Sequence, residues 1–182
     1  MEIVLFLAIA AFVLIVLAGM YNRLITLKHR VDNAWAQIDV QLKRRADLVP
    51  NLVETVKGYM QHERRTLEAV TEARARLTRG GSVGEQAQAN NMLSEALRTV
   101  FAVAEAYPQL KADRNFLLLQ EELSGIENKI AYARQHYNDN VLGLNAATER
   151  FPTNLVAGIF GIRRRDYFEV QAADREPVRV EF

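Results

Sequence analysis

The stretch Ile3–Met20, IVLFLAIAAFVLIVLAGM, contains eighteen consecutive apolar or small residues and no charged one. At about 1.5 Å of rise per residue, a helix of this length spans roughly 27 Å, close to the hydrocarbon thickness of a bilayer. After Tyr21 the chain is rich in charged residues and keeps a helical period. The sequence therefore predicts an all-α chain in which one N-terminal transmembrane helix ties a helical domain to a membrane.

The flanks of this stretch favour an uncleaved anchor over residues 1–21. A cleaved signal peptide needs a positively charged start and an apolar core of about 7–15 residues. Here only Met1 and Glu2 precede a longer core. A bacterial lipoprotein needs a Cys just after the apolar stretch, whereas this chain has Met20 there and no Cys anywhere. We therefore expect a single-pass anchor without that lipid.

Basic residues beside the anchor bear on its orientation. Arg23, Lys28 and Arg30 follow it closely, and only the α-amino group and Glu2 lie on its other side. The positive-inside rule therefore places the large domain in the cytoplasm. A very short N-terminal tail gives little contrast, so an extracytoplasmic domain stays open as the alternative.

Composition excludes several classes of protein. Lys plus Arg number 23 and Asp plus Glu number 22, so no strong field favours nucleic acid. The lack of Cys excludes disulfides, thiolate metal sites and Cys nucleophiles. About 160 residues remain after the anchor, which is enough for one domain with a real core.

Apolar residues recur at steps of three and four from Leu24 to Leu77, which is a helical period. Charged residues such as Arg44 and Arg45 fall off this face and are expected on a solvated surface. Pro50 is the one interruption. Either the helix ends near Arg45 and a new one begins at Asp47, or one long helix kinks at Pro50. The lack of Gly between Met20 and Gly58 favours the kinked helix, and both readings stay open.

Two further helices follow a turn. The turn is GGSVG at residues 80–84, the next helix is predicted over 85–106, and a long helix is predicted over 114–150 with Asp113 as its N-cap. Sustained three-four spacing is typical of coiled-coil-like antiparallel packing. We expect an elongated, antiparallel up-and-down bundle of three to four long helices over residues 22–152.

Residues 153–182 differ in character and are predicted to form a short amphipathic segment and an extended tail. An apolar run, LVAGIFGI at residues 155–162, precedes three arginines, an order that suits a membrane interface. The candidate interface residues are Leu155, Val156, Ile159, Phe160, Arg163, Arg164 and Arg165. The alternative is a short helix that caps the bundle. The closing PVRVEF, residues 177–182, either lies extended along the bundle or acts as a peptide ligand.

No pattern for catalysis, a metal or a cofactor is present. His62-Glu63 lacks the second His of a zinc-protease helix, because Thr66 stands four residues on. The glycines at 80–84 lack the Lys-Ser/Thr ending of a phosphate loop. Polar residues around the apolar seam of the last long helix fix its register if buried and mean little if exposed. These are Asn138, Asp139, Asn140 and Asn145.

Three stretches together resemble the LemA family. They are NAWAQIDVQLKRRADLVPNLVETVKGYMQHERRTLEAVTEARA at residues 33–75, YPQLKADRNFLLLQEELSGIENKIAYARQHYNDNV at 107–141, and FPTNLVAG at 151–158 followed by YFE. The resemblance implies a bacterial protein with an N-terminal anchor and an up-and-down bundle, usually of four helices. It brings no established catalytic residues. One relative in magnetosome-forming bacteria is linked to shaping the inner membrane.

The leading functional expectation is a non-enzymatic, membrane-anchored scaffold that self-associates and organises or shapes the bacterial inner membrane. Membrane lipid and further copies of the chain are the expected partners, without nucleic acid, a small-molecule substrate or a cofactor. The alternative is an adaptor in envelope stress or signalling that docks a membrane protein such as a protease.

Overall fold

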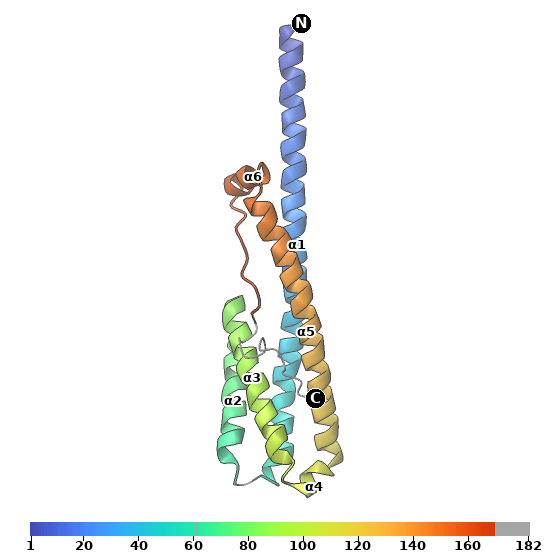
Figure 1. Cartoon of the computed structure of the whole chain (residues 1–182), viewed down its shortest axis with the longest axis vertical. Helices are drawn as coiled ribbons and strands as arrows, with labels where there is room; N and C mark the ends of the chain where they lie inside the picture. Colours follow the sequence, from blue (N-terminus) through green and yellow to red (C-terminus); the bar gives the residue numbers. More distant parts are fainter. Residues whose placement is uncertain (61, 170–182) are drawn as a thin grey trace, which may run out of the picture. The chain divides into compact units, whose positions relative to one another are not determined.

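The computed structural model describes residues 1–60 and 62–169, and within these ranges it contains helices and no strand (Figure 1). The prediction of an all-α fold, with a long apolar N-terminal helix followed by a helical bundle, is confirmed. The helices are α1 (Glu2–Lys57), α2 (Arg64–Thr78), α3 (Val83–Ala104), α4 (Pro108–Lys111), α5 (Arg114–Glu149) and α6 (Thr153–Ile159).

The chain forms two compact units, and α1 and α5 contribute to both. The anchor unit consists of Met1–Ala36 and Gln135–Asp166. The bundle unit consists of Gln37–Arg134 and the described residues 167–169. The closing PVRVEF lies outside the described residues. The three-part division predicted from the sequence, 1–21, 22–152 and 153–182, follows the membrane and stays a prediction.

The helix α1 continues through Pro50 and ends at Lys57. The run from Leu24 to Leu77 is therefore two helices, and the break lies at residues 58–63. The alternative in which the helix breaks near Pro50 is wrong. Pro50 has no N–H for the carbonyl of Ala46, four residues earlier. The Nε of Arg74 in α2 donates to that carbonyl at 2.8 Å, so the unpaired oxygen has a partner.

Apolar side chains at helical spacing, mostly aliphatic, form the core of the bundle unit, as the stripes predicted. A fully buried Val, Leu or Ile contributes about 1.5–3 kcal/mol relative to exposure. In the bundle unit, α2 and α3 run side by side in opposite directions (Figure 1). Core residues there include Ile38, Leu42, Val49, Leu52, Val56, Val70, Leu77, Leu93, Leu97, Val100, Phe116, Leu123, Ile126 and Ile130.

Side-chain caps fix where α3 and α5 begin. At α3, Ser82 and Glu85 form a reciprocal capping box. At α5, a carboxylate oxygen of Asp113 accepts from the backbone N–H groups of Asn115 and Phe116, at 2.8 and 3.1 Å. The predicted N-cap is therefore confirmed. The short α4, with Pro108 in its first turn, is an addition to the predicted elements.

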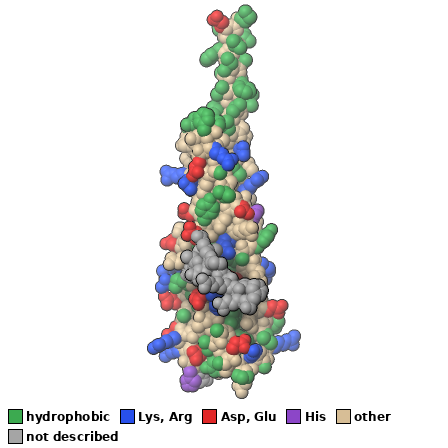
Figure 2. All heavy atoms as spheres, viewed as in Figure 1, with side chains coloured by type: hydrophobic (Ala, Val, Ile, Leu, Met, Phe, Trp, Pro, Cys, Tyr) green, Lys and Arg blue, Asp and Glu red, His purple; other side chains and the backbone are tan. Residues whose placement is uncertain are grey.

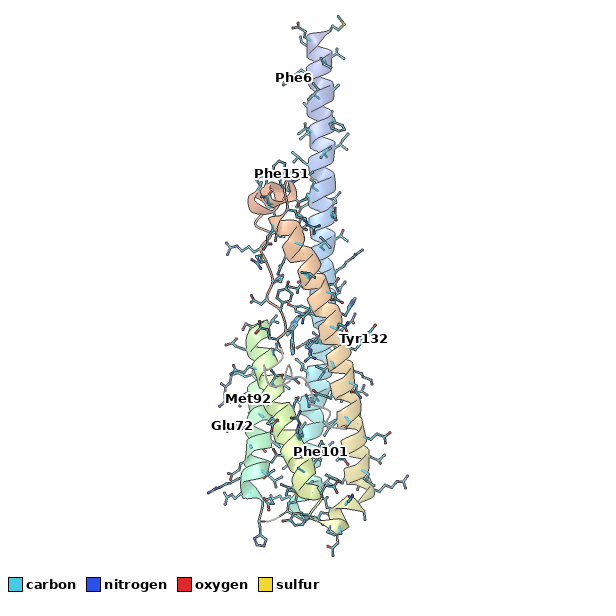
Figure 3. All side chains as sticks on the ribbon, viewed as in Figure 1. Phe6, Glu72, Met92, Phe101, Tyr132 and Phe151 are labelled. Carbon is cyan, nitrogen blue, oxygen red and sulfur yellow. The ribbon has the colours of Figure 1, made fainter. Side chains whose placement is uncertain are left out.

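The N-terminal stretch of α1, in the anchor unit, is apolar and exposed on all sides. Its most apolar window has a mean hydropathy of 3.1 and no buried residue. By length and composition, this is a helix able to cross a membrane. Figure 2 shows hydrophobic side chains covering this stretch, and Figure 3 shows Phe6 pointing away from the helix into open space.

Candidate membrane-interface site

Within the anchor unit, α6 packs against α1 at the place where the apolar stretch ends. Val156 and Ala157 of α6 form a buried cluster with Leu24 of α1. The rings of Tyr21 and Phe160 lie 4.5 Å apart and are tilted by 47°. The helix α6 is therefore held within about one turn of Met20, at the end of the predicted span.

Large apolar side chains in and beside α6 are exposed. Leu155 and Ile159, four residues apart on one face of α6, are 57% and 78% exposed. Phe160, just after α6, is 57% exposed although its ring lies against Tyr21, and Phe151, before α6, is 80% exposed. Figure 3 shows Phe151 beside α6. We call these four side chains the apolar tip. A cluster of large apolar side chains exposed to solvent indicates a binding surface.

Of the predicted interface residues, Leu155, Ile159 and Phe160 therefore lie on an open surface. Val156 does not, because it is 2% exposed and belongs to the core. The short helix α6 therefore combines both expected roles: Val156 and Ala157 are buried against α1, whereas Leu155 and Ile159 are open. Phe151 was not among the residues predicted from the sequence. An aromatic residue directly before Pro152, just past the end of a long helix, was the available signal.

The three arginines after α6 are exposed and differ in their partners. Arg164 Nη1 lies 2.9 Å from Glu149, and Arg165 Nη2 lies 3.1 Å from Asp32, both within the anchor unit. Such exposed pairs contribute about 0–1 kcal/mol each. Among the described residues, Arg163 has no ion pair, so the arginines are not equivalent.

Asn145 holds the backbone that follows α6. It is 4% exposed, its Nδ2 donates to the Arg165 carbonyl at 3.0 Å, and its Oδ1 accepts from the Arg165 N–H at 2.9 Å. Asn140, in contrast, bonds back to His136 of its own helix. The polar residues of α5 were expected to fix the register of the helix if buried and to have little role if exposed. The buried Asn145 fits the role in register.

Tyr137 supports the same segment. Its hydroxyl donates to the Asp166 carbonyl at 2.9 Å, and its ring lies 5.6 Å from that of Trp35. Burial is the main reason that the pKa of Tyr137 is raised. Asn145 and Tyr137 together fix the chain from Arg165 to Asp166 against α5.

A buried polar cluster lies in the bundle unit around Arg45, which is 3% exposed. Its Nη1 donates to Asn90 at 2.7 Å and to Ser94 at 2.9 Å, and lies 2.5 Å from Glu127. Burial lowers the pKa of Arg45, and the charge of Glu127 acts in the opposite direction. The expectation that Arg45 lies on a solvated face is wrong, because its partners sit on α3 and α5, far along the chain.

The described residues offer little for metal chemistry. Residues 1–60 and 62–169 contain no group of three or more His, Asp or Glu side chains that could hold a metal ion. His62, the candidate ligand considered from the sequence, is exposed near the start of α2.

An exposed apolar helix joined to a helical bundle is the build of a membrane-associated α-helical protein. A model of the LemA family matches residues 34–182, most of the chain, and the chain belongs to that family. The resemblance drawn from its motifs is thereby confirmed.

Curated relatives share much of the chain at low identity. Magnetosome protein MamQ 2 of Paramagnetospirillum magneticum is 23% identical over 94% of this chain and 72% of its own length. Protein LemA of Metamycoplasma hominis is 27% identical over 90% of this chain and 75% of its own. Magnetosome protein MamQ of Magnetospirillum gryphiswaldense is 22% identical over 87% and 68%.

Proposed function

We propose that this protein is a non-enzymatic scaffold of the bacterial inner membrane, anchored by α1 and in contact with the membrane interface through α6. It self-associates and thereby organises or shapes the bilayer. One observation carries the proposal: the apolar tip belongs to the same compact unit as the anchor and lies where the anchor's apolar stretch ends.

The tip gives the chain a second hold on the lipid. Burying a Leu, Ile or Phe side chain fully contributes about 1.5–3 kcal/mol, so even partial burial of four such residues favours contact. Arg163 follows the tip and suits anionic headgroups. Because α6 is held against α1, insertion of the tip requires no rearrangement of the fold.

Insertion beside an anchor is a means of bending a membrane. A spanning helix displaces lipid in both leaflets, whereas a tip that enters only the near leaflet expands that leaflet alone. Many copies side by side add these small asymmetries. The likeness to proteins named Magnetosome protein MamQ supports this, since the family resemblance already implies a relative linked to membrane shaping.

The experiment compares two triple variants of the full chain in vesicles. Leu155→Ser/Ile159→Ser/Phe160→Ser removes most of the tip. Val40→Ser/Leu117→Ser/Tyr132→Ser is the matched control, because these bundle-unit residues are also large, apolar and exposed. We expect the wild type and the control to deform vesicles under electron microscopy and the tip variant to lose this activity. Equal deformation by both variants would contradict the proposal.

Self-association and orientation have their own tests. Chemical crosslinking in membranes should give a ladder of self-products, and strict monomers at every concentration would remove that part of the proposal. The bundle is proposed to be cytoplasmic, on the basis of Arg23, Lys28 and Arg30. In the Cys-free chain, Tyr132→Cys should resist an impermeant maleimide in intact cells and react in lysed ones.

An adaptor is the second candidate, favoured by a groove in the bundle unit. The groove has a volume of about 1140 Å³ and lies between the end of α1 and α2. Val53, Met60 and Leu67 contribute apolar surface to it, and Lys57 and Glu68 contribute charge. An amphipathic helix of a partner has this character. One dominant foreign crosslinked product, in place of a self-ladder, would favour the adaptor.

A further inference from the structure

A cavity of about 450 Å³ lies in the anchor unit, between α1 and the turn that joins α5 to α6. The α1 side consists of Val16, Gly19, Met20 and Arg23. The other side comes from Gly143, Ala147 and Arg150–Thr153. The cavity thus extends from the end of the apolar stretch, at Val16–Met20, to Arg23, the first cationic residue after it.

Gly19 leaves room for a side chain on the α1 side of the cavity. A Cβ built at Gly19 meets no heavy atom within 4 Å, so a side chain there extends into free space. Across the cavity, a Cβ at Gly143 meets only the Leu27 side chain, at an ordinary 3.9 Å. A larger residue at position 19, which lines the cavity, can therefore be introduced without displacing the backbone.

Two unpaired arginines give the cavity its charge. Arg23 and Arg150 line it, and neither guanidinium makes an ion pair or hydrogen bond within the described residues. The nearby Arg164 and Arg165, in contrast, are paired with carboxylates. No Asp or Glu is among the described residues that line the cavity. Two arginines that line one cavity without a carboxylate favour an anion, and guanidinium binds phosphate in a bidentate manner.

The position of the cavity along α1 favours the phosphate of a phospholipid over a free phosphate ion. Arg23 lies three residues past Met20, about 4.5 Å along the helix, at the level where headgroups meet the hydrocarbon. Val16 and Met20 offer apolar contact on the bilayer side. A ligand that is anionic at one end and apolar at the other matches both ends of the site.

We propose that this cavity binds the headgroup of an anionic phospholipid, with the phosphate between Arg23 and Arg150 and an acyl chain along Val16 and Gly19. The inference rests on the proposed function, because it needs the tip at the membrane interface. It adds a specific lipid site to a general apolar contact. The scaffold thereby recruits the lipid beside which it inserts.

The test uses the full chain in detergent and native mass spectrometry, which counts bound lipids. The probes are phosphatidylglycerol, phosphatidylcholine and inorganic phosphate. Arg23→Gln/Arg150→Gln removes the charge, and Gly19→Leu fills the space. Arg30→Gln/Arg65→Gln is the control, since these exposed arginines lie outside the cavity and make no ion pair in the described chain.

We expect the wild type and the control to retain phosphatidylglycerol in preference to phosphatidylcholine. Arg23→Gln/Arg150→Gln should bind phosphatidylglycerol roughly tenfold to thirtyfold more weakly. Gly19→Leu should also lose the lipid while keeping both charges. Equal retention by Arg23→Gln/Arg150→Gln and the wild type would overturn the proposal. Phosphate ion binding with the same dependence on both arginines, and no preference among the lipids, would overturn the assignment to a lipid.

A fluorophore at Ile159→Cys distinguishes a failure of the lipid-site proposal from a failure of the proposed function. If the fluorophore still reports an apolar environment in vesicles while lipid retention is unchanged by the variants, only the specific site is wrong. If the fluorophore reports water, the interface contact itself is wrong.

Discussion

The Nε of Arg74 donates a hydrogen bond of 2.8 Å to the carbonyl oxygen of Ala46, the residue four positions before Pro50. In a regular helix the N–H of residue 50 fills this place, and Pro has none. Ala46 is buried, so an unpaired carbonyl there is costly. A side chain from α2 thus compensates for a proline in α1.

Replacement of Arg74 by Met should therefore destabilise the bundle unit, by about 1–2 kcal/mol in denaturant unfolding. Pro50→Ala should restore most of this loss, because an alanine at that position supplies the missing N–H. Arg64→Met is the control, since Arg64 pairs only with Glu68 of its own helix and both side chains are exposed. A loss that is the same with and without Pro50 would show that Arg74 acts in another way.

Asn145→Ala should lower the free energy of unfolding by about 1–2 kcal/mol, because two hydrogen bonds to Arg165 are lost together. Asn140→Ala should change it by less than about 0.5 kcal/mol, since Asn140 bonds only within α5. Hydrogen exchange of the Arg165 amide provides the direct readout. Unchanged protection of that amide in Asn145→Ala would contradict the described contact.

Glu127→Ala should cost about 1–3 kcal/mol, less than a fully buried pair because Glu127 is half exposed. The cost arises because the buried Arg45 loses its countercharge. Arg45→Met in the same chain should recover much of the loss. The control is Glu122→Ala, which removes an exposed partner 3.9 Å from Arg44 and should cost little. Equal losses of stability in Glu127→Ala and Glu122→Ala would show that the buried Arg45 does not depend on Glu127 for its countercharge.

The cap of α5 predicts a dependence on pH. The backbone N–H of Phe116 foremost, and then those of Asn115 and the Tyr59 hydroxyl, hold the pKa of Asp113 below its usual range. A pKa depressed in the folded state stabilises the fold above the unfolded pKa, near 4, and this contribution is lost as the pH falls through the folded pKa. Asp113→Asn should flatten the acid limb of stability against pH. An unchanged slope would contradict the role of the cap.

Local chemistry was predictable wherever partners lie close in sequence. The N-cap at Asp113, the GGSVG turn and the apolar stripes of α1 and α5 are short-range patterns, and the structure follows them. The break after Lys57 was missed because Pro50 is the stronger local signal. The carbonyl of Ala46 that Pro50 leaves without its helical donor is paired with Arg74, which comes near only after folding.

The same limit applies to the site. From the sequence, Arg45 is predicted to be a surface charge. In the structure, α3 and α5 place Asn90 and Glu127 beside it. Asn145 finds its partner twenty positions further on, as the numbers of the bonded residues show. Within α6, apolar spacing alone did not separate Val156, which is buried, from Ile159, which is open. Which face of a short helix is buried depends on packing against α1, beyond the reach of its own sequence.

A fluorescent label at position 159 reports whether the apolar tip enters the membrane interface. The full chain carrying Ile159→Cys is labelled with an environment-sensitive fluorophore and reconstituted in vesicles. Phe6→Cys serves as the reference for the hydrocarbon and Tyr132→Cys as the reference for water, because both side chains are exposed in the protein. We expect blue-shifted emission at position 159, between the two references. Emission at 159 equal to that at 132 would contradict it.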